Sequence, residues 1–352
     1  ERASFVISPC LQSPQLPHPS KPDKHVIVIG AAGGMGLWAA RHWFAELSDV
    51  SRVTLCDLET LSADARSTMA DVPASIDSAR ARYGTSGLSL VDCEVVDSGR
   101  DPVQVPPELE NIDLVVLATP LSVIESVMDG LNGKLAQGAW LIDMASVKST
   151  PLEQMTAGSG DGVSVVGTHP LFGITGDSVS GRTVALVPTD SDDGQLISWL
   201  DNGLKQLGAS TLQVTARKHD RYMLIAQTMT HFALMAFGEA VTRSLNEDES
   251  LEELREFGTP PYLAMGNVTG RLLVQNHRLY ASIQQAEGAD DIRDTFAQAA
   301  RQLADSFDQG SLGDIEAEIG QLAERYGTAE LEASARLSEK MFRADQSGNT
   351  ED

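Results

Sequence analysis

The sequence is poor in cysteine and lysine, and it has no long apolar run. Its three cysteines, Cys10, Cys56 and Cys93, are odd in number and widely spaced, so they predict neither a disulfide framework nor a zinc site. The longest apolar runs are far too short to cross a bilayer, and no secretion signal opens the chain. These absences make a membrane partner unexpected and favour a cytoplasmic, reducing setting.

Positive charge is also scarce. The 352 residues include 26 Lys and Arg, only seven of them Lys, against 50 Asp and Glu, which gives a net charge of −24. Such a surface repels phosphate backbones, so nucleic acid is not an expected partner. A small anionic substrate would need a local cationic pocket, and an arginine near a polar cluster is therefore a candidate binding residue.

The spacing of apolar runs predicts two folded domains. The length of the chain predicts the same number, because a domain has roughly 150 residues. Residues 1–24 are rich in Pro and Ser and are predicted to be an arm or linker. From 25 to 190, short runs rich in Val, Ile and Leu alternate with helical stretches, which is typical of α/β domains with a mostly parallel sheet. No strand is expected after Asp190, and residues 191–345 are predicted to form an all-α domain, with Pro260 beginning one helix and Gly310 ending another. A flexible tail is expected at 346–352.

The first apolar run leads into the glycine-rich stretch VIGAAGGMG. Its glycines lie three apart, as G-x-x-G-x-x-G, and allow backbone N–H groups to approach a pyrophosphate at a helix N-terminus. The next strand ends in Asp57, about 20 residues later, where a Rossmann-like domain places the acid that binds the NAD ribose. A surface acid at a strand end is the alternative. Because Asp57 would repel the 2′-phosphate of NADP, NAD is the predicted cofactor.

Further candidate cofactor residues end a later strand, at the carboxyl edge of the sheet where ligands bind in such folds. These are Thr119 and Pro120, although a plain strand-end turn explains Pro120 equally well. The full predicted cofactor-binding set is Gly30, Gly33, Gly34, Met35, Gly36, Asp57, Thr119 and Pro120.

Three other segments carry polar residues in unusual places. Ser146 and Lys148 follow one strand, and His169 ends the next, within GTHPLFG. A long, mostly apolar helix from His219 to Ala240 is predicted to be buried. At 100° per residue, Asp220, Gln227 and His231 fall within about 40° on this helix, as either a structural network or one wall of a polar cleft. For His231 alone a packed core histidine is the simpler interpretation, and for Arg271 the alternative is a buried salt bridge.

These motifs together resemble the prephenate dehydrogenase family, which includes the arogenate dehydrogenases. The matching pieces, in order, are VIGAAGGMG, LVVLATP, LIDMASVK, VVGTHPLFG, HDxxxxxxQxxxHF and GRLxxQNxxLY, which span residues 25 to 290. The order and spacing of SVK and GxHPxFG are highly specific. The closest likeness is to the bacterial branch often fused to a chorismate mutase. A fused domain, if any, is expected upstream of this chain, and no tyrosine-sensing domain is expected at its C-terminus.

The resemblance implies a homodimer that converts prephenate to 4-hydroxyphenylpyruvate with NAD. His169 matches the histidine that accepts the hydroxyl proton, a task suited to imidazole near neutral pH. Ser146 matches a residue that hydrogen-bonds this histidine and the hydroxyl, and Lys148 is expected to support the site electrostatically. The substrate-binding residues implied are Arg271, as the carboxylate anchor, with His231, Gln227 and Tyr280 lining the same pocket.

Two departures keep the substrate open. Leu263 stands where some relatives of this branch carry a second arginine, and residues 58–113 match the family poorly. Arogenate and 4-amino-4-deoxyprephenate are therefore rival substrates for the same reaction. A non-catalytic NAD-sensing protein is a rival of another class, although a sensor needs no arrangement of Ser146, His169 and Arg271.

Overall fold

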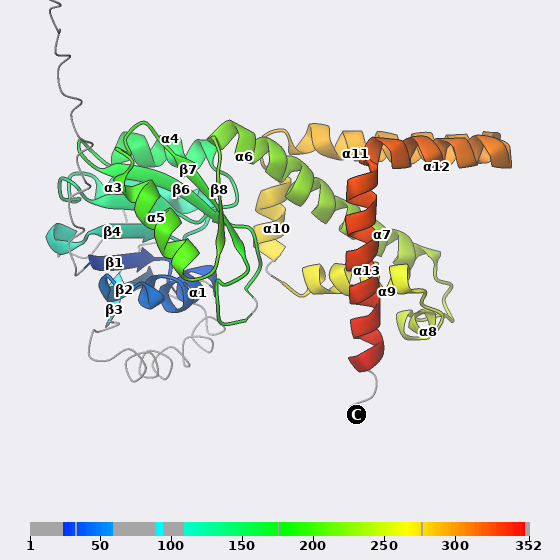
Figure 1. Cartoon of the computed structure of the whole chain (residues 1–352), viewed down its shortest axis with the longest axis horizontal. Coiled ribbons are helices and arrows are strands. Elements are labelled where there is room, and N and C mark those ends of the chain that lie inside the picture. Colours follow the sequence, from blue (N-terminus) through cyan, green and yellow to red (C-terminus); the bar gives the residue numbers. More distant parts are fainter. Residues whose placement is uncertain are drawn as a thin grey trace, which may run out of the picture. The chain divides into compact units, whose positions relative to one another are not determined.

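The computed structural model describes residues 24–31, 34–58, 89–93, 109–174, 176–275 and 277–348. The chain divides into two compact units (Figure 1). The sheet unit comprises Glu1–Met144 and Leu152–Gln213, and the helical unit comprises Ala145–Pro151 and Val214–Asp352. Each unit is described by itself below.

The sheet unit is built on an eight-stranded sheet with the order β3-β2-β1-β4-β5-β6-β7-β8. Neighbouring strands are parallel except for β6 and β7, which are antiparallel. The order of the first six strands is that of doubly wound dinucleotide-binding folds. The strands are β1 (Lys24–Ile29), β2 (Val50–Leu58), β3 (Ser89–Cys93), β4 (Leu114–Leu117), β5 (Trp140–Asp143), β6 (Ser164–Pro170), β7 (Thr183–Pro188) and β8 (Ser210–Gln213).

The core of the sheet unit lies between these strands and the helices that flank them. Central strands such as β4 are buried along their whole length, as their continuous Val and Leu runs predict for a sheet covered on both faces. Trp43 and Phe44 stack with ring centroids 4.7 Å apart and are fully buried. The flanking helices are α1 (Gly34–His42), α3 (Ile124–Leu131), α4 (Ser149–Gly158) and α5 (Gln195–Gln206).

The helical unit consists of helices with clear sequence signals at their ends. Ser250 and Ser311 each form a capping box, with Glu253 and Asp314 respectively, and Pro260 begins its helix as predicted. The elements are α6 (Ala216–Met223), the π-helical segment η4 (Leu224–Met229), α7 (Thr230–Ser244), α8 (Leu251–Glu256), α9 (Pro260–Leu273), α10 (His277–Gln284), α11 (Ala289–Gln309), α12 (Leu312–Tyr326) and α13 (Thr328–Gly348).

Several expectations about boundaries are wrong. The helical unit begins at Val214 rather than near residue 191, because α5 and the late strand β8 complete the sheet unit. The first three residues of the expected tail, 346–348, belong to α13, while 349–352 and residues 1–23 of the predicted arm lie outside the described residues.

Cys56 forms a disulfide bond, a cross-link that three widely spaced cysteines did not predict.

The predicted long helix forms without a break, since α6, η4 and α7 follow one another from Ala216 to Ser244, but its middle is the π-helical segment η4. The prediction that it is buried is wrong for the single chain, because α7 has no buried residue. The apolar positions around α7 therefore need a covering surface that the described part of one chain does not supply. A π-helix turns less per residue than an α-helix, so the 100° projection does not carry from Asp220 to His231. Within the described residues, no helix is long and apolar enough to span a membrane.

Candidate active site

The glycine loop lies where β1 meets α1, and its shape requires glycine at two positions. Gly30 has a φ of +86°, and a Cβ there would lie 2.7 Å from the Ala118 carbonyl oxygen at the end of β4. A Cβ on Gly36 would lie 2.4 Å from the Gly30 carbonyl oxygen. The backbone at the start of α1 is therefore packed directly against the ends of two strands, as a pyrophosphate-binding turn requires.

The structure describes side-chain surroundings for some of the other predicted cofactor residues and the backbone alone for one of them. Thr119 adjoins the loop, since a side chain at position 30 would bring its Cβ within 3.0 Å of the Thr119 Cγ2. Its buried hydroxyl has no hydrogen-bond partner among the described residues. Pro120 is exposed at the start of a short helical turn. Asp57 pairs in register with Asp92 of β3 near the end of β2, and only its backbone is described.

Gly33 lies outside the described residues, whereas Gly34 and Met35 begin α1. Gly34 is exposed, and a Cβ there would meet Ile174 Cδ1 at 2.4 Å. Met35 packs against the core of the sheet unit. The loop after β6 therefore approaches the first turn of α1, close to the glycine loop.

His169 is the penultimate residue of β6 and is 5% exposed. Its backbone pairs with Ala185 of β7, and the neighbouring Thr168 hydroxyl donates to the Asp143 carbonyl of β5 at 2.5 Å. Because β1, β4, β5 and β6 are parallel, their carboxyl ends share one edge of the sheet. His169 thus lies on the same edge as Gly30 and Thr119, where ligands bind in open α/β sheets.

The loop that follows His169 is tied to α1. The Trp38 indole donates to the Gly176 carbonyl oxygen at 2.9 Å, and its ring contacts that of Phe172 edge-on. The Arg182 guanidinium lies 4.7 Å from the Phe172 ring centroid and donates to the Gly173 carbonyl oxygen. These contacts join the loop to the helix that begins at the glycine motif.

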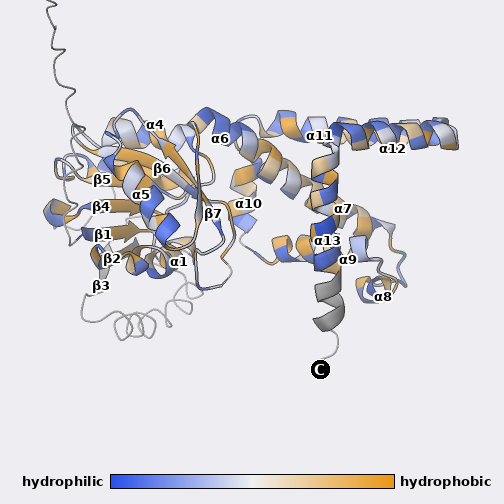
Figure 2. Cartoon of the chain, in the orientation of Figure 1, coloured by the Kyte–Doolittle hydropathy of each residue, from blue (hydrophilic) through white to orange (hydrophobic). Residues whose placement is uncertain are grey.

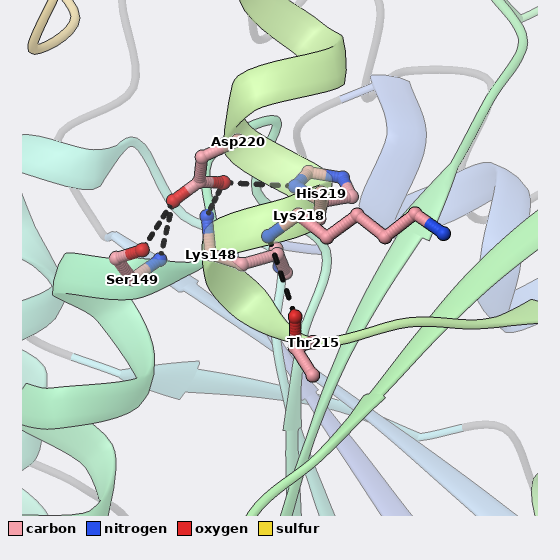
Figure 3. Close-up of polar contacts among 6 residues, drawn as sticks. All are labelled: Lys148, Ser149, Thr215, Lys218, His219 and Asp220. Atoms are coloured by element: carbon pink, nitrogen blue, oxygen red, sulfur yellow. Dashed lines mark hydrogen bonds and ion pairs between the residues drawn. The ribbon is translucent and has the colours of Figure 1, made fainter.

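The segment Ala145–Pro151, which carries Ser146 and Lys148, belongs to the helical unit and is fastened there by Asp220 of α6 (Figure 3). The Asp220 carboxylate accepts from the backbone N–H of Lys148 at 2.7 Å and of Ser149 at 2.8 Å, and from the Ser149 hydroxyl at 2.6 Å. It also bonds Nδ1 of the buried His219 at 2.8 Å. The segment is thereby held at the start of α4. The Lys148 side chain is fully buried and Ser146 is half-buried.

The charge state of Asp220 follows from these bonds. Burial alone would raise the pKa of its carboxyl, but the hydrogen bonds from His219, Ser149 and Lys148 outweigh it and lower the pKa to about 2. Asp220 is therefore ionised at neutral pH. Of the two predicted roles for the polar stripe, Asp220 takes the structural one, and sequence analysis did not identify its partners Ser149 and His219.

Two of the predicted substrate residues of the helical unit, His231 and Tyr280, are in contact. The rings of His231 (α7) and Tyr280 (α10) meet edge-on with centroids 4.7 Å apart. Burial raises the pKa of Tyr280, and the positive charge of Arg271, an exposed residue of α9, opposes that rise. Burial lowers the pKa of His231, and its buried Nδ1 has no partner among the described residues. Gln227 is half-exposed within η4.

The arrangement provides a dinucleotide-type loop with a histidine on the same sheet edge, and a histidine in contact with a tyrosine in the helical unit. Models of the prephenate dehydrogenase nucleotide-binding domain and dimerization domain match residues 85–213 and 215–319, respectively. The chain belongs to the prephenate dehydrogenase family. It therefore contains the nucleotide-binding and dimerization domains of that family.

Relatives and solved structures agree with this assignment. The chain is 34% identical over 197 residues to a probable arogenate/prephenate dehydrogenase of Methanocaldococcus jannaschii, covering 55% of this chain and 43% of that protein. It is 29% identical to a 4-amino-4-deoxyprephenate dehydrogenase of Streptomyces pristinaespiralis, covering 90% and 96%. The chain spans about half or less of the length of the first curated relatives it matches.

The fold is similar to that of the A. aeolicus prephenate dehydrogenase, crystallised with hydroxyphenyl propionate and NAD+. The TM-score is 0.60 at 15% identity, over 85% of this chain and 96% of the other. The predicted architecture, a Rossmann-like domain followed by a helical domain, is confirmed.

Proposed function

We propose that the chain catalyses the NAD-dependent oxidative decarboxylation of prephenate to 4-hydroxyphenylpyruvate. The observation that carries this proposal is the buried His169 at the carboxyl edge of the sheet, on the same edge as the glycine loop. A base at that edge adjoins the place where a dinucleotide of this fold presents its reactive ring. The family membership of both domains supports the same reaction.

The residues of the glycine loop fit NAD. Glycine at positions 30 and 36 lets the loop pack against the Ala118 and Gly30 carbonyl oxygens in the tight strand-to-helix turn that binds a pyrophosphate. The buried Thr119 hydroxyl beside this loop is a polar group that a ligand can satisfy. When bound, NAD supplies the acceptor for the hydride that leaves the ring carbon bearing the hydroxyl. The A. aeolicus prephenate dehydrogenase, which has a similar fold, was crystallised with NAD+, and this favours the same cofactor here.

In this proposal the chain's own residues bind the substrate and move one proton. His169 accepts the proton of the ring hydroxyl as that carbon is oxidised to a carbonyl. The ring carboxylate then leaves as CO2, its bonding electrons complete the aromatic ring, and the ring oxygen takes the proton back from His169 to give the phenol. Ser146 and Lys148 orient and stabilise the reacting hydroxyl, and Arg271, with Tyr280, His231 and Gln227, holds the substrate.

Arogenate and 4-amino-4-deoxyprephenate undergo the same reaction and are the alternative substrates. The name of the S. pristinaespiralis relative, which aligns with 90% of this chain, favours the second, and the name of the M. jannaschii relative includes the first. Turnover of the three compounds with NAD, followed by NADH absorbance, separates them. Tight NAD binding without turnover of any of the three would instead favour the sensor hypothesis.

NAD is proposed to be strongly preferred over NADP because Asp57, near the end of β2, pairs in register with Asp92 of the neighbouring strand. An acidic strand end repels a 2′-phosphate. We expect kcat/KM to be at least about tenfold higher with NAD, a ratio that corresponds to about 1.4 kcal/mol of charge repulsion. Equal values with the two cofactors would contradict the role given to Asp57.

A homodimer is also proposed. The domain matched over 215–319 is the family's dimerization domain. Large apolar side chains of the helical unit are exposed in the single chain, among them Phe257 at 83% and Leu312 at 83%. Soluble monomers rarely expose so many apolar side chains, and a second copy would cover them.

A further inference from the structure

The loop that follows His169 places one exposed apolar side chain against the start of α1. Ile174 is 50% exposed, and a Cβ at position 34 would collide with its Cδ1. Gly34 is the first residue of α1, and its backbone is not in the left-handed region that favours glycine. Apart from the residues next to it in the chain and in its helix, Ile174 is the only described residue within 4 Å of that Cβ. The absence of a side chain at position 34 therefore gives Ile174 its space.

The backbone on both sides of Ile174 is held in place. Before it, the Arg182 guanidinium donates to the Gly173 carbonyl oxygen at 3.2 Å. After it, the Trp38 indole donates to the Gly176 carbonyl oxygen at 2.9 Å. Because Trp38 belongs to α1, the second bond fastens the loop to the helix that Ile174 touches. The side chain is thus kept at the N-terminus of α1 although half of its surface is open to solvent.

This exposure is unusual within its own unit. In the described part of the sheet unit, Ile174 and Leu212 are the only large apolar side chains that are exposed. A single exposed apolar side chain is ordinary in itself. Ile174 differs from Leu212 because it is fixed beside the glycine loop, where the N-terminus of a helix receives a pyrophosphate. A ligand bound there would cover it.

The strand order indicates which part of the dinucleotide lies beside this side chain. β2 flanks β1 on one side, and β4, β5 and β6 follow on the other. Asp57, near the end of β2, is the proposed partner of the adenine-side ribose, so the adenine half extends towards β2. The nicotinamide half then extends from the pyrophosphate towards β4, β5 and β6. Ile174 reaches α1 from the end of β6 and therefore comes from the nicotinamide side.

We propose that Ile174 is a cofactor-contacting residue that packs against the nicotinamide half of NAD, beside the pyrophosphate. This inference rests on the proposed function, which makes NAD the cofactor. The contact removes apolar surface of the side chain and of the cofactor from water, and so strengthens binding. Because His169 lies five residues before Ile174, one short segment carries both the proposed base and a contact to the half of NAD that accepts the hydride.

The test is the dissociation constant for NAD, measured by calorimetry without substrate. Ile174→Ala is expected to raise the Kd for NAD by about 3- to 30-fold, the effect of losing one apolar contact. The Kd for AMP, which contains only the adenine half, should stay unchanged. The matched control is Leu212→Ala, which truncates an equally exposed side chain (51%) on the outermost strand β8. It should leave both constants unchanged.

The contact between the loop and α1 is tested by a double-mutant cycle. Gly34→Ala adds a methyl group that collides with Ile174, and it is expected to raise the Kd for NAD. In the Ile174→Ala background the same change should cost less, because the collision is gone. An equal cost in the two backgrounds would contradict the proposal, since the position of Ile174 would then have no influence on binding.

An unchanged Kd for NAD in Ile174→Ala would overturn the proposal and would leave the side chain to be covered by the helical unit instead. An equal rise for NAD and AMP would also overturn it, because the loss would then not be confined to the nicotinamide half. If Ile174→Ala does not fold, Ile174→Thr, which keeps the branched shape but loses apolar surface, is judged by the same two constants.

The outcome for the proposed function is separate. A wild type that binds NAD but turns over none of the candidate substrates would refute the reaction, and the binding constants would still test Ile174. A wild type that does not bind NAD would overturn both the cofactor assignment and this inference.

Discussion

The two units bury their apolar side chains to very different extents. The sheet unit contains fully buried strands and a continuous core, whereas only Leu272, Ile283 and Ala289 of the described helical unit are buried apolar residues. Figure 2 shows orange, apolar strands in the sheet unit but alternating orange and blue along α11, α12 and α13. The sheet unit can therefore be stabilised by its own packing, and the helical unit depends on further contacts.

The proposed site residues are also divided between the two units. The cofactor loop and His169 lie in the sheet unit, and Ser146, Lys148, Arg271, Tyr280 and His231 lie in the helical unit. We expect a substitution at His169 to alter the rate of the chemical step, and substitutions at Arg271 and on the exposed apolar faces of the helical unit to alter binding and assembly.

The largest effect is expected at His169. His169→Asn should lower kcat by about 10²–10⁴-fold with little change in KM, the span typical of a lost general base. A protonated imidazole cannot accept a proton, so wild-type activity should fall as the pH is lowered, and the variant should lack that dependence. Steady-state kinetics across pH measure both. A near-normal kcat in the variant would leave His169 with only a packing role.

A smaller effect on a different constant is expected at Arg271. Arg271→Ala should raise KM by about 10- to 100-fold and change kcat little, because a carboxylate anchor acts in the ground state and the transition state alike. Arg271→Lys should give an intermediate KM, since it keeps the charge but loses the planar pair of donors. A fall in kcat at constant KM would contradict the role of Arg271 as a carboxylate anchor.

The incomplete burial of the helical unit is tested at Ile319, which is 57% exposed in α12. Ile319→Glu should weaken the proposed homodimer by about tenfold or more, because association would bury an unpaired charge. Gln321→Glu adds the same charge on another face of the helix and should have little effect. Molar mass by light scattering against concentration gives the dissociation constant. A wild type that is monomeric at micromolar concentration would refute the dimer.

The smallest effect is expected at Asp220. Asp220→Ala should lower the free energy of unfolding at neutral pH by about 1–2 kcal/mol, from the lost bonds to Lys148, Ser149 and His219. The folded-state pKa of about 2 lies below the ordinary 3.8. The carboxylate therefore stabilises the fold fully above pH 3.8, and this contribution is lost as the pH falls towards 2.

Denaturant titrations of wild type and Asp220→Ala at several pH values measure this difference. It should shrink through that window. A difference that stays constant from neutral pH down to about pH 2 would show that the charge of Asp220 is not what stabilises this region.

The sheet unit was the more predictable of the two. The apolar runs predicted as strands between residues 25 and 190 form strands, because runs such as LVVL of β4 are continuous and are buried on both faces. The short eighth strand, β8, was missed because STLQ is mostly exposed and has no apolar pattern. Gly30 and Gly36 were correctly identified, since backbone contact excludes any side chain there.

The helical unit was less predictable because its important contacts are not local. The projection of Asp220, Gln227 and His231 on one stripe assumed uniform helix, and the π-helical η4 lies between the first and the last. Asp220 bonds residues 71 and 72 positions away, and the cluster of His231 with Tyr280 joins separate helices. The roles of Ser146, Lys148 and Arg271 came from the family resemblance and remain predictions.

The assignment of Ala145–Pro151 to the helical unit has a consequence for synthesis and for inheritance. During translation this segment emerges well before Val214, so the backbone amides of Lys148 and Ser149 lack Asp220 while the remaining sheet strands are made. A fragment ending at Gln213 contains every strand of the described sheet yet leaves the start of α4 without its carboxylate. A fragment starting at Val214 carries the carboxylate without the amides. A recombination event that exchanged only the residues from Val214 onward would leave Ala145–Pro151 in place. The incoming helical unit would then need a carboxylate that fits the backbone amides of Lys148 and Ser149.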